Sequence, residues 1–298
     1  MRMNRSHPTP LRAAVNGIEI AYQSFGEDHL PCILLIMGLG SQMQTWHDNF
    51  CIRLAGCGYR VVRFDNRDCG QSSVFDASGI PNISAILSGQ CPPLPYSLKD
   101  MASDAIGLLD SLHIDKAHVV GASMGGMIAQ LMAIDWPRRL RTLTTVMSST
   151  GRLGLPGPTP EAQKILFTPP PLNLNQDSFV PYFIDNWRVV AGDKLPFEED
   201  RIRDLATSTW QRGYHPAGIA RQFAAMAMAG DRKPRLAKVT IPSLVIHGAE
   251  DPLIPPACGR DIAEGIPGAS FHLIDGMGHD LPESRWDDII GAMVAHIR

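Results

Sequence analysis

A serine flanked by glycines stands directly between an apolar strand and a helix, and this arrangement restricts the possible folds more than any other part of the sequence. Residues His118–Gly126 read HVVGASMGG and contain a G-x-S-x-G pattern around Ser123. A serine on such a sharp strand-to-helix turn has a strained backbone, and only small residues fit at the flanking positions of Gly121 and Gly125. The turn lifts the hydroxyl above the sheet, and the helix N-terminus favours negative charge there. This context predicts a nucleophile, whereas the bare pattern also occurs in chance Gly-Ser turns.

A serine hydroxyl needs a general base at neutral pH, and one histidine stands in a suitable setting. His279 ends the glycine-rich stretch DGMGH, directly after the last predicted strand. Chains with this strand–serine–helix turn carry the residues in the order serine, acid, histidine. Of the ten histidines, only His279 combines that order with a loop setting; His272, for example, lies inside the last predicted strand. The alternative interpretation of His279 is an exposed loop histidine.

The predicted acid is Asp251, which follows the strand Ser243–His247 and a tight turn and precedes a proline. It lies 28 residues before His279, which leaves room for one helix and one strand. Glu250 is a neighbouring competitor, and a plain Asp-Pro turn is the alternative interpretation. Some chains of this type carry the acid one strand earlier, but that position reads Ser148–Thr150 here and has no carboxylate. The acid would hold the imidazole tautomer and stabilise the imidazolium without taking the proton.

Attack by the serine would create an oxyanion, which requires two backbone N–H donors. We expect one donor from Met124, the residue after the predicted nucleophile. We expect the second from Leu39, within the loop Met37–Gly40 that follows the third predicted strand. An ordinary glycine turn is the alternative interpretation of that loop.

Strands alternate with helices along most of the chain. Most of the strand candidates are short, continuous apolar runs, which is typical of strands buried on both faces of a parallel sheet. Such alternation predicts right-handed βαβ units in an α/β fold with a mostly parallel sheet and helices on both sides. The predicted elements are a hairpin over Arg12–Tyr22 turning at Asn16-Gly17, strands over Cys32–Met37, Arg60–Asp65, His118–Gly121, Leu140–Met147, Ser243–His247 and Ser270–Ile274, and helices over Leu98–Leu112, Met127–Ile134 and Trp286–Ile297.

The alternation stops between residues 151 and 232, where Gly/Pro-rich stretches and amphipathic helical segments replace it. We predict a helical cap over 151–232, inserted into a core made of residues 1–150 and 233–298. Aromatic residues are concentrated in the cap, where they would line an apolar pocket or form the cap's own small core. These residues are Phe179, Tyr182, Phe183, Trp187, Trp210 and Tyr214.

Composition and charge argue against several function classes. The 298 residues are 44% hydrophobic, enough for a buried core, but the apolar run Cys32–Met37 is too short to span a bilayer. The net charge is −3 without a basic run, so no nucleic-acid partner is expected. Residues 1–10 lack the apolar stretch of a secretory signal, which predicts a cytoplasmic protein. The six cysteines lack metal-ligand spacing and no phosphate-binding glycine motif is present, so we expect neither a metal nor a cofactor.

The sequence resembles the α/β-hydrolase superfamily, and more closely its capped esterase branch, which includes aclacinomycin methylesterase. The resemblance covers nearly the whole chain and is weakest in the predicted cap. It implies an α/β-hydrolase fold, with a mostly parallel eight-stranded sheet flanked by helices and a helical cap insertion. Many relatives have His-Gly where this chain has Met37-Gly38, which suggests a subgroup and leaves the backbone donor in place. The motifs that carry the resemblance are Gly121–Gly126, Met37–Gly40, Phe64–Ser72 and Leu244–Pro252.

The resemblance also implies roles for single residues. Ser123, Asp251 and His279 would form a catalytic triad, and Leu39 and Met124 would supply the oxyanion hole.

Residues shortly after the fourth strand and after the oxyanion loop have two interpretations each. The arginine and glycine within Asp65–Ser72 would brace the oxyanion loop, and Arg67 as a substrate-binding cation is the alternative. Trp46 and His47 would line the pocket or pack as ordinary core side chains.

The implied activity is hydrolysis of a carboxylic ester of a small, largely apolar substrate through an acyl-enzyme intermediate. The same triad could act on a lactone, an amide or a C–C bond or perform perhydrolysis, because these reactions differ in pocket shape. A non-catalytic receptor for a small ligand on the same scaffold is the alternative outside catalysis. The sequence does not indicate the oligomeric state.

Overall fold

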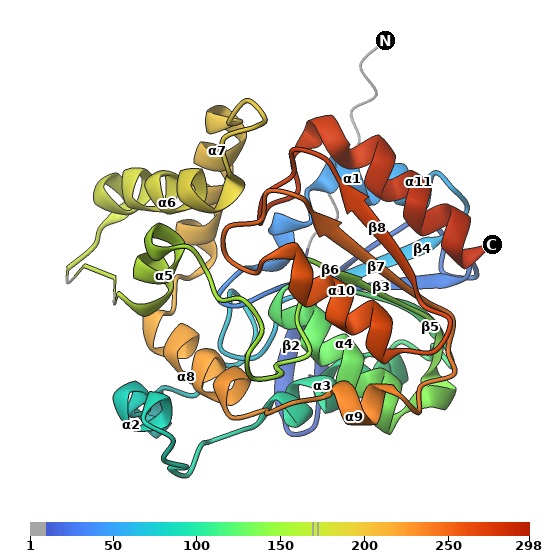
Figure 1. The fold of residues 1–298 in the computed structure, drawn as a ribbon, viewed down its shortest axis with the longest axis horizontal. Helices are drawn as coiled ribbons and strands as arrows, with labels where there is room; N and C mark the ends of the chain where they lie inside the picture. Colours follow the sequence, from blue (N-terminus) through green and yellow to red (C-terminus); the bar gives the residue numbers. More distant parts are fainter. Residues whose placement is uncertain (1–9, 169, 172) are drawn as a thin grey trace.

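The computed structural model describes residues 10–168, 170–171 and 173–298, which are built around one eight-stranded sheet (Figure 1). The strand order is β1-β2-β4-β3-β5-β6-β7-β8. β2 runs antiparallel to both of its neighbours, and all other pairings are parallel, so the predicted mostly parallel sheet is confirmed. The strands are β1 (Leu11–Val15), β2 (Ile18–Phe25), β3 (Cys32–Ile36), β4 (Arg60–Phe64), β5 (Ala117–Ala122), β6 (Leu140–Val146), β7 (Ser243–Gly248) and β8 (Ser270–Ile274).

The helices predicted from the sequence are present, and others occur that the sequence pattern did not reveal. The helix after Ser123 begins at Met124, three residues earlier than predicted. Among the helices of the described ranges, none combines the length and the apolar character of a bilayer-spanning segment. The helices are α1 (Asp48–Ala55), α2 (Ile83–Leu87), α3 (Leu98–Ser111), α4 (Met124–Asp135), α5 (Pro160–Phe167), α6 (Gln176–Ala191), α7 (Glu199–Arg212), α8 (Pro216–Ala227), α9 (Lys233–Leu236), α10 (Pro256–Gly265) and α11 (Trp286–Ile297).

Helices cover both faces of the sheet and bury two hydrophobic cores. α3, α4 and α10 pack on one face, and α1 and α11 pack on the other (Figure 1). The central strand β3 contributes to both cores, because Leu34 and Ile36 point to the first face and Ile33 and Leu35 to the second. All four side chains are at most 1% exposed, as expected for a strand covered on both sides.

The helices α5, α6, α7 and α8, together the α5–α8 segment, lie between β6 and β7 in the chain and to one side of the sheet (Figure 1). α6 packs against α7 around a small apolar cluster that includes Ile184 and Ile202. α8 is attached to the core by a buried ion pair in which Arg221 donates two hydrogen bonds to Asp68. The α5–α8 segment falls within the predicted cap, whose limits of 151 and 232 stay a prediction.

The first nine residues lie outside the described residues, and so does the prediction about a secretory signal that rests on them. Pro169 and Leu172 of the predicted cap also lie outside the described part of the chain.

Candidate active site

Ser123 occupies a strained turn between β5 and α4. Its backbone has φ 56° and ψ −122°, a region that non-glycine residues rarely adopt. A Cβ on Gly121 would lie 2.1 Å from the carbonyl oxygen of Gly125. A Cβ on Gly125 would lie 2.2 Å from the carbonyl oxygen of Ile36 on β3. The two glycines of the G-x-S-x-G pattern are therefore required by close backbone contacts on both sides of the serine.

The structure brings Ser123, His279 and Asp251 into one hydrogen-bonded row. The Oγ of Ser123 lies 3.0 Å from Nε2 of His279, and Nδ1 of the same ring lies 2.8 Å from Oδ2 of Asp251. A carboxylate can only accept, so the ring carries its proton on Nδ1 and leaves Nε2 free to accept from the serine hydroxyl. The three residues come from the loops after β5, β8 and β7, at the carboxyl edge of the sheet.

The carboxylate of Asp251 is fixed on both of its oxygens. Oδ1 accepts hydrogen bonds from the backbone N–H of Leu253 at 2.9 Å and Ile254 at 2.8 Å. Burial by itself would raise the pKa of Asp251, but the rings of His279 and His247 and the hydrogen bonds outweigh it and lower the pKa to about 2. The group therefore stays ionised at neutral pH, as is required to orient and stabilise an imidazolium.

The loop that carries His279 is held by α6. The backbone N–H of His279 donates to the carbonyl oxygen of Val190 at 2.7 Å. A Cβ on Gly278 would lie 2.2 Å from the carbonyl oxygen of Ala191, so a larger residue would push the loop off the helix end. The side chain of His279 is 9% exposed and faces a cavity. The position of the predicted base thus depends on an element of the α5–α8 segment.

The two predicted oxyanion donors belong to residues close to Ser123: Met124 follows it in the chain, and Leu39 follows Gly38, whose backbone approaches the serine. Met124 is the first residue of α4, and Leu39 lies in the loop after β3, which approaches the serine so closely that a Cβ on Gly38 would be 2.9 Å from Cβ of Ser123. Neither backbone N–H has a hydrogen-bond partner among the described residues. Two unpartnered donors beside a serine hydroxyl can stabilise an oxyanion.

The loop after β4 braces the oxyanion loop, but through other side chains than predicted. The amide of Asn66 donates to the carbonyl oxygen of Met37 at 2.9 Å, and Asp65 accepts from the N–H of Met43 at 2.8 Å. The prediction that the Arg67 side chain braces this loop is wrong, because Arg67 forms a buried bidentate ion pair with Asp104. For the same reason Arg67 is not a substrate-binding cation.

Trp46 and His47 do not line the cavity. Trp46 is fully buried and its ring packs on Phe50 with the centroids 5.6 Å apart. His47 precedes α1 and accepts from the N–H of Asn49 with its ring Nδ1. Both residues therefore have the structural role that was the alternative interpretation.

A cavity of about 260 Å³ opens between the triad and the α5–α8 segment. Such a volume is close to the lower end for small-molecule sites. The predicted aromatic residues serve both roles considered for them: all but Trp210 line the cavity, and Phe179 also packs on Phe183, Trp210 and Tyr214. The other lining side chains include Ser41, Thr45, Met147, Ile165, Leu166, Asn186, Val190, Thr209, Ile219, Leu253, Asp280 and Leu281.

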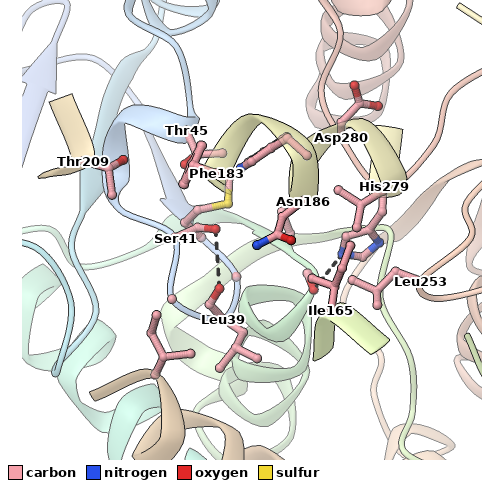
Figure 2. A pocket seen from close by; sticks show the side chains of 18 of the residues that line it. Leu39, Ser41, Thr45, Ile165, Phe183, Asn186, Thr209, Leu253, His279 and Asp280 are labelled. Atoms are coloured by element: carbon pink, nitrogen blue, oxygen red, sulfur yellow. Dashed lines mark hydrogen bonds between the residues drawn. The ribbon is translucent and has the colours of Figure 1, made fainter. Parts of the chain in front are cut away.

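Asn186 is a lining residue that the sequence interpretation missed. It lies on α6 one turn after Tyr182 and one turn before Val190, and all three line the cavity. Figure 2 shows its amide between Ser41 and His279, directed into the cavity. This amide has no hydrogen-bond partner among the described residues and is free to bind a substrate. The four-residue spacing with Tyr182 was the only sequence signal that could have indicated it.

Asp280, the residue after the predicted base, is a second buried carboxylate at the site. Its Oδ1 has no hydrogen-bond partner among the residues that the structure describes. Burial raises the pKa of Asp280 to about 7; the nearby Arg201 acts in the opposite direction, and Glu198 adds to the rise. Figure 2 shows the carboxylate directed away from the ring of His279.

Asp280→Asn is expected to stabilise the fold at pH 8, by about 2–4 kcal/mol. Between about pH 4 and pH 7 the folded protein holds a proton at Asp280 that the unfolded chain has released, so stability falls as the pH rises through this window. The neutral amide of the Asp280→Asn variant does not ionise, so this variant does not lose stability in that pH window. Urea denaturation at pH 5 and pH 8 measures the effect, with the exposed Asp185→Asn as control. An equal gain at both pH values would contradict the prediction.

Comparison with known proteins gives matches over nearly the whole chain. Residues 33–292 match the model of the alpha/beta hydrolase family. Rhodomycin D methylesterase DnrP of Streptomyces peucetius is 30% identical, over 97% of this chain and 98% of that protein. The 3-oxoadipate enol-lactonase 2 of Acinetobacter baylyi is 27% identical, over 87% of this chain and 85% of that protein. The solved enol-lactonase from Burkholderia xenovorans has a TM-score of 0.69 and 27% identity, covering 96% of this chain and 99% of its own.

Proposed function

The chain belongs to the alpha/beta hydrolase family, and we propose that it is a carboxylic ester hydrolase with a Ser123–His279–Asp251 triad. The observation that carries the proposal is the unbroken row of hydrogen bonds from the Ser123 hydroxyl to the Asp251 carboxylate, open to an apolar cavity. The methylesterase relative supports an ester as the substrate class.

The geometry supports acyl transfer in two steps. Ser123 Oγ attacks the ester carbonyl carbon while His279 Nε2 takes the hydroxyl proton and then gives it to the leaving alcohol. The backbone N–H groups of Leu39 and Met124 hold the oxyanion in each tetrahedral intermediate. Water then attacks the acyl-enzyme with His279 again as the base. The product is a carboxylic acid, and Ser123 is regenerated.

The cavity favours an uncharged substrate. Among the described residues, no lysine or arginine side chain lines it, and the one carboxylate in its lining is that of Asp280. A substrate carboxylate would lose its hydration there without gaining a cation, which costs several kcal/mol. This argues against carboxylate-bearing substrates such as an oxoadipate lactone, and for a neutral ester whose apolar part contacts Phe183 and Trp187.

A matched pair of esters tests the substrate charge. p-Nitrophenyl hexanoate and mono-p-nitrophenyl adipate differ only in a terminal carboxylate. We expect kcat/KM to be at least about 100-fold higher for the hexanoate, because the buried carboxylate lacks a partner. Initial rates of nitrophenol release, corrected for spontaneous hydrolysis, measure the ratio.

Asn186→Lys supplies the control for this pair, because it places a cation in the cavity where Figure 2 shows the Asn186 amide. This variant should narrow the preference for the neutral ester by raising the rate on the adipate. Similar rates of the unaltered protein on both esters would contradict the inference about charge. No turnover of either ester would contradict ester hydrolysis itself and favour a receptor.

A further inference from the structure

The N–H of Leu39 lies in a peptide unit whose two neighbours in the chain are both fixed by buried side chains. On one side, Asn66 binds the carbonyl oxygen of Met37 at 2.9 Å and fixes the Met37–Gly38 peptide. On the other side, the N–H of Gly40 donates to Oε1 of Gln222 at 2.9 Å and fixes the Leu39–Gly40 peptide. The orientation of the Leu39 donor is set between these two anchors.

Gln222 differs from Asn66 because it comes from α8, in the α5–α8 segment. Its side chain is fully buried, and its amide also donates to the carbonyl oxygen of Arg67 at 2.7 Å. Both ends of the amide are thus engaged, so the side chain cannot rotate without leaving a buried polar group unsatisfied. One side chain of α8 joins the oxyanion loop to the loop after β4.

The helix that carries Gln222 is itself held rigidly against the core. The preceding residue, Arg221, pairs with the fully buried Asp68 at 2.7 and 2.8 Å. A Cβ on Gly218 would lie 2.3 Å from the carbonyl oxygen of Asp68. Ile219 contacts the oxyanion loop directly, since a Cβ on Gly40 would lie 2.9 Å from its Cγ1. These contacts fix the position of α8 on the core. The hydrogen bond from Gly40 to Gln222 in turn fixes the oxyanion loop relative to α8.

We propose that Gln222 is a positioning residue for catalysis, which aligns the Leu39 N–H with the oxyanion through the Leu39–Gly40 peptide. The proposal rests on the proposed ester hydrolysis and adds that the inserted helices help to build the oxyanion hole as well as the substrate pocket. Gln222 is not among the residues that line the cavity, so a loss of its hydrogen bonds leaves the substrate contacts in place.

Gln222→Met tests the proposal, because methionine fills a similar volume without hydrogen bonds. We expect kcat for p-nitrophenyl hexanoate to fall about 10-fold with KM within about twofold, less than the loss of a whole donor. Gln222→Glu keeps an acceptor for the Gly40 N–H, and because burial favours the protonated acid, its O–H can replace the donor to the Arg67 carbonyl oxygen, so we expect it to recover part of kcat. His215→Phe is the matched control, since it removes another bond between this segment and the core, to the carbonyl oxygen of Gly70 at 3.0 Å.

A pair of inhibitors separates positioning from mere loss of stability. An aryl trifluoromethyl ketone adds Ser123 Oγ to its carbonyl carbon and places an oxyanion in the hole, whereas the parent methyl ketone binds without addition. We expect Gln222→Met to raise the inhibition constant of the first about 10-fold and to leave that of the second unchanged. His215→Phe should lower Tm without changing either constant.

Two results would overturn the proposal in distinguishable ways. Unchanged kcat and inhibition constants in Gln222→Met, with a lowered Tm, would reduce Gln222 to a structural residue while ester hydrolysis stands. Absence of ester turnover in the unaltered protein would overturn the proposed function, and the role of Gln222 with it.

Discussion

Ser123→Ala is expected to lower kcat for p-nitrophenyl hexanoate by about 10⁵-fold, because the variant retains the pocket and the oxyanion donors but has no nucleophile. Water positioned by His279 would be the only remaining route. Nitrophenol release followed over hours at high enzyme concentration measures the residual rate. Mass spectrometry of rapidly quenched unaltered enzyme should find the hexanoyl group on the peptide that contains Ser123.

The loss must be separated from unfolding. Because Ser123 has a positive φ that alanine tolerates no better, the variant should unfold at nearly the same temperature as the unaltered protein. Thr144→Val removes a buried hydroxyl with no hydrogen-bond partner in the described structure and provides a control away from the turn. Turnover by Ser123→Ala within tenfold of the unaltered rate would exclude the serine as nucleophile.

Asp251→Asn is expected to lower kcat by about 10⁴-fold with little change in KM. An amide nitrogen facing Nδ1 of His279 favours the tautomer that carries its proton on Nε2, and that ring cannot accept the proton of Ser123. Because the pKa of Asp251 is lowered to about 2, the unaltered protein keeps the carboxylate at every pH suited to ester assays. The deficit should therefore be similar across the neutral range.

Glu250→Gln is the matched control for the acid. Glu250 is the neighbouring carboxylate on the same turn, it is partly exposed, and its nearest cation is Lys194 at 3.9 Å. Its replacement should change kcat by less than about twofold, in keeping with the small contribution of exposed ion pairs. A large loss of kcat in Glu250→Gln together with an active Asp251→Asn would show that Glu250, and not Asp251, is the acid of the triad.

The sequence was most informative where a local contact dictates the residue type. The G-x-S-x-G pattern predicted the turn at Ser123, because a Cβ on either glycine would lie only 2.1 or 2.2 Å from a backbone oxygen. The Asn16-Gly17 turn was predictable for a similar reason, and both residues have positive φ, 50° and 78°. Runs of four to eight residues, most of them continuously apolar, were sufficient to identify the parallel strands.

The helix predictions failed where close packing requires glycine at a position inside a helix. Glycine has a low helix propensity, so it hides the helical pattern. α10 contains Gly259, where a Cβ would lie 2.3 Å from Nδ1 of His247, and this glycine weakens the helical pattern. The first turn of α4 contains Gly125 and Gly126, so the predicted start at Met127 was late. Tertiary contacts determine the residue type at these positions, so the hydrophobic periodicity alone cannot predict the helices correctly there.

The pocket and the bracing of the oxyanion loop were the least predictable. Arg67 was assigned to the wrong role because its partner, Asp104, is 37 residues away in the chain. Gln222 is 182 residues from Gly40, and nothing in its local sequence marks it. Such long-range pairs are determined by the tertiary arrangement of the helices on the sheet, which the local sequence does not indicate.

Two hydrogen bonds to the backbone of the site loops limit which helical segments could replace α5–α8 without loss of activity. α6 holds the His279 loop through the carbonyl oxygen of Val190, and α8 holds the Gly40 N–H through Gln222. An insertion that looks modular in topology is therefore not interchangeable in chemistry. A chimera carrying another protein's helices would inherit a new pocket, but it would keep its turnover only if the transplant also brought a carbonyl and an amide to these two places.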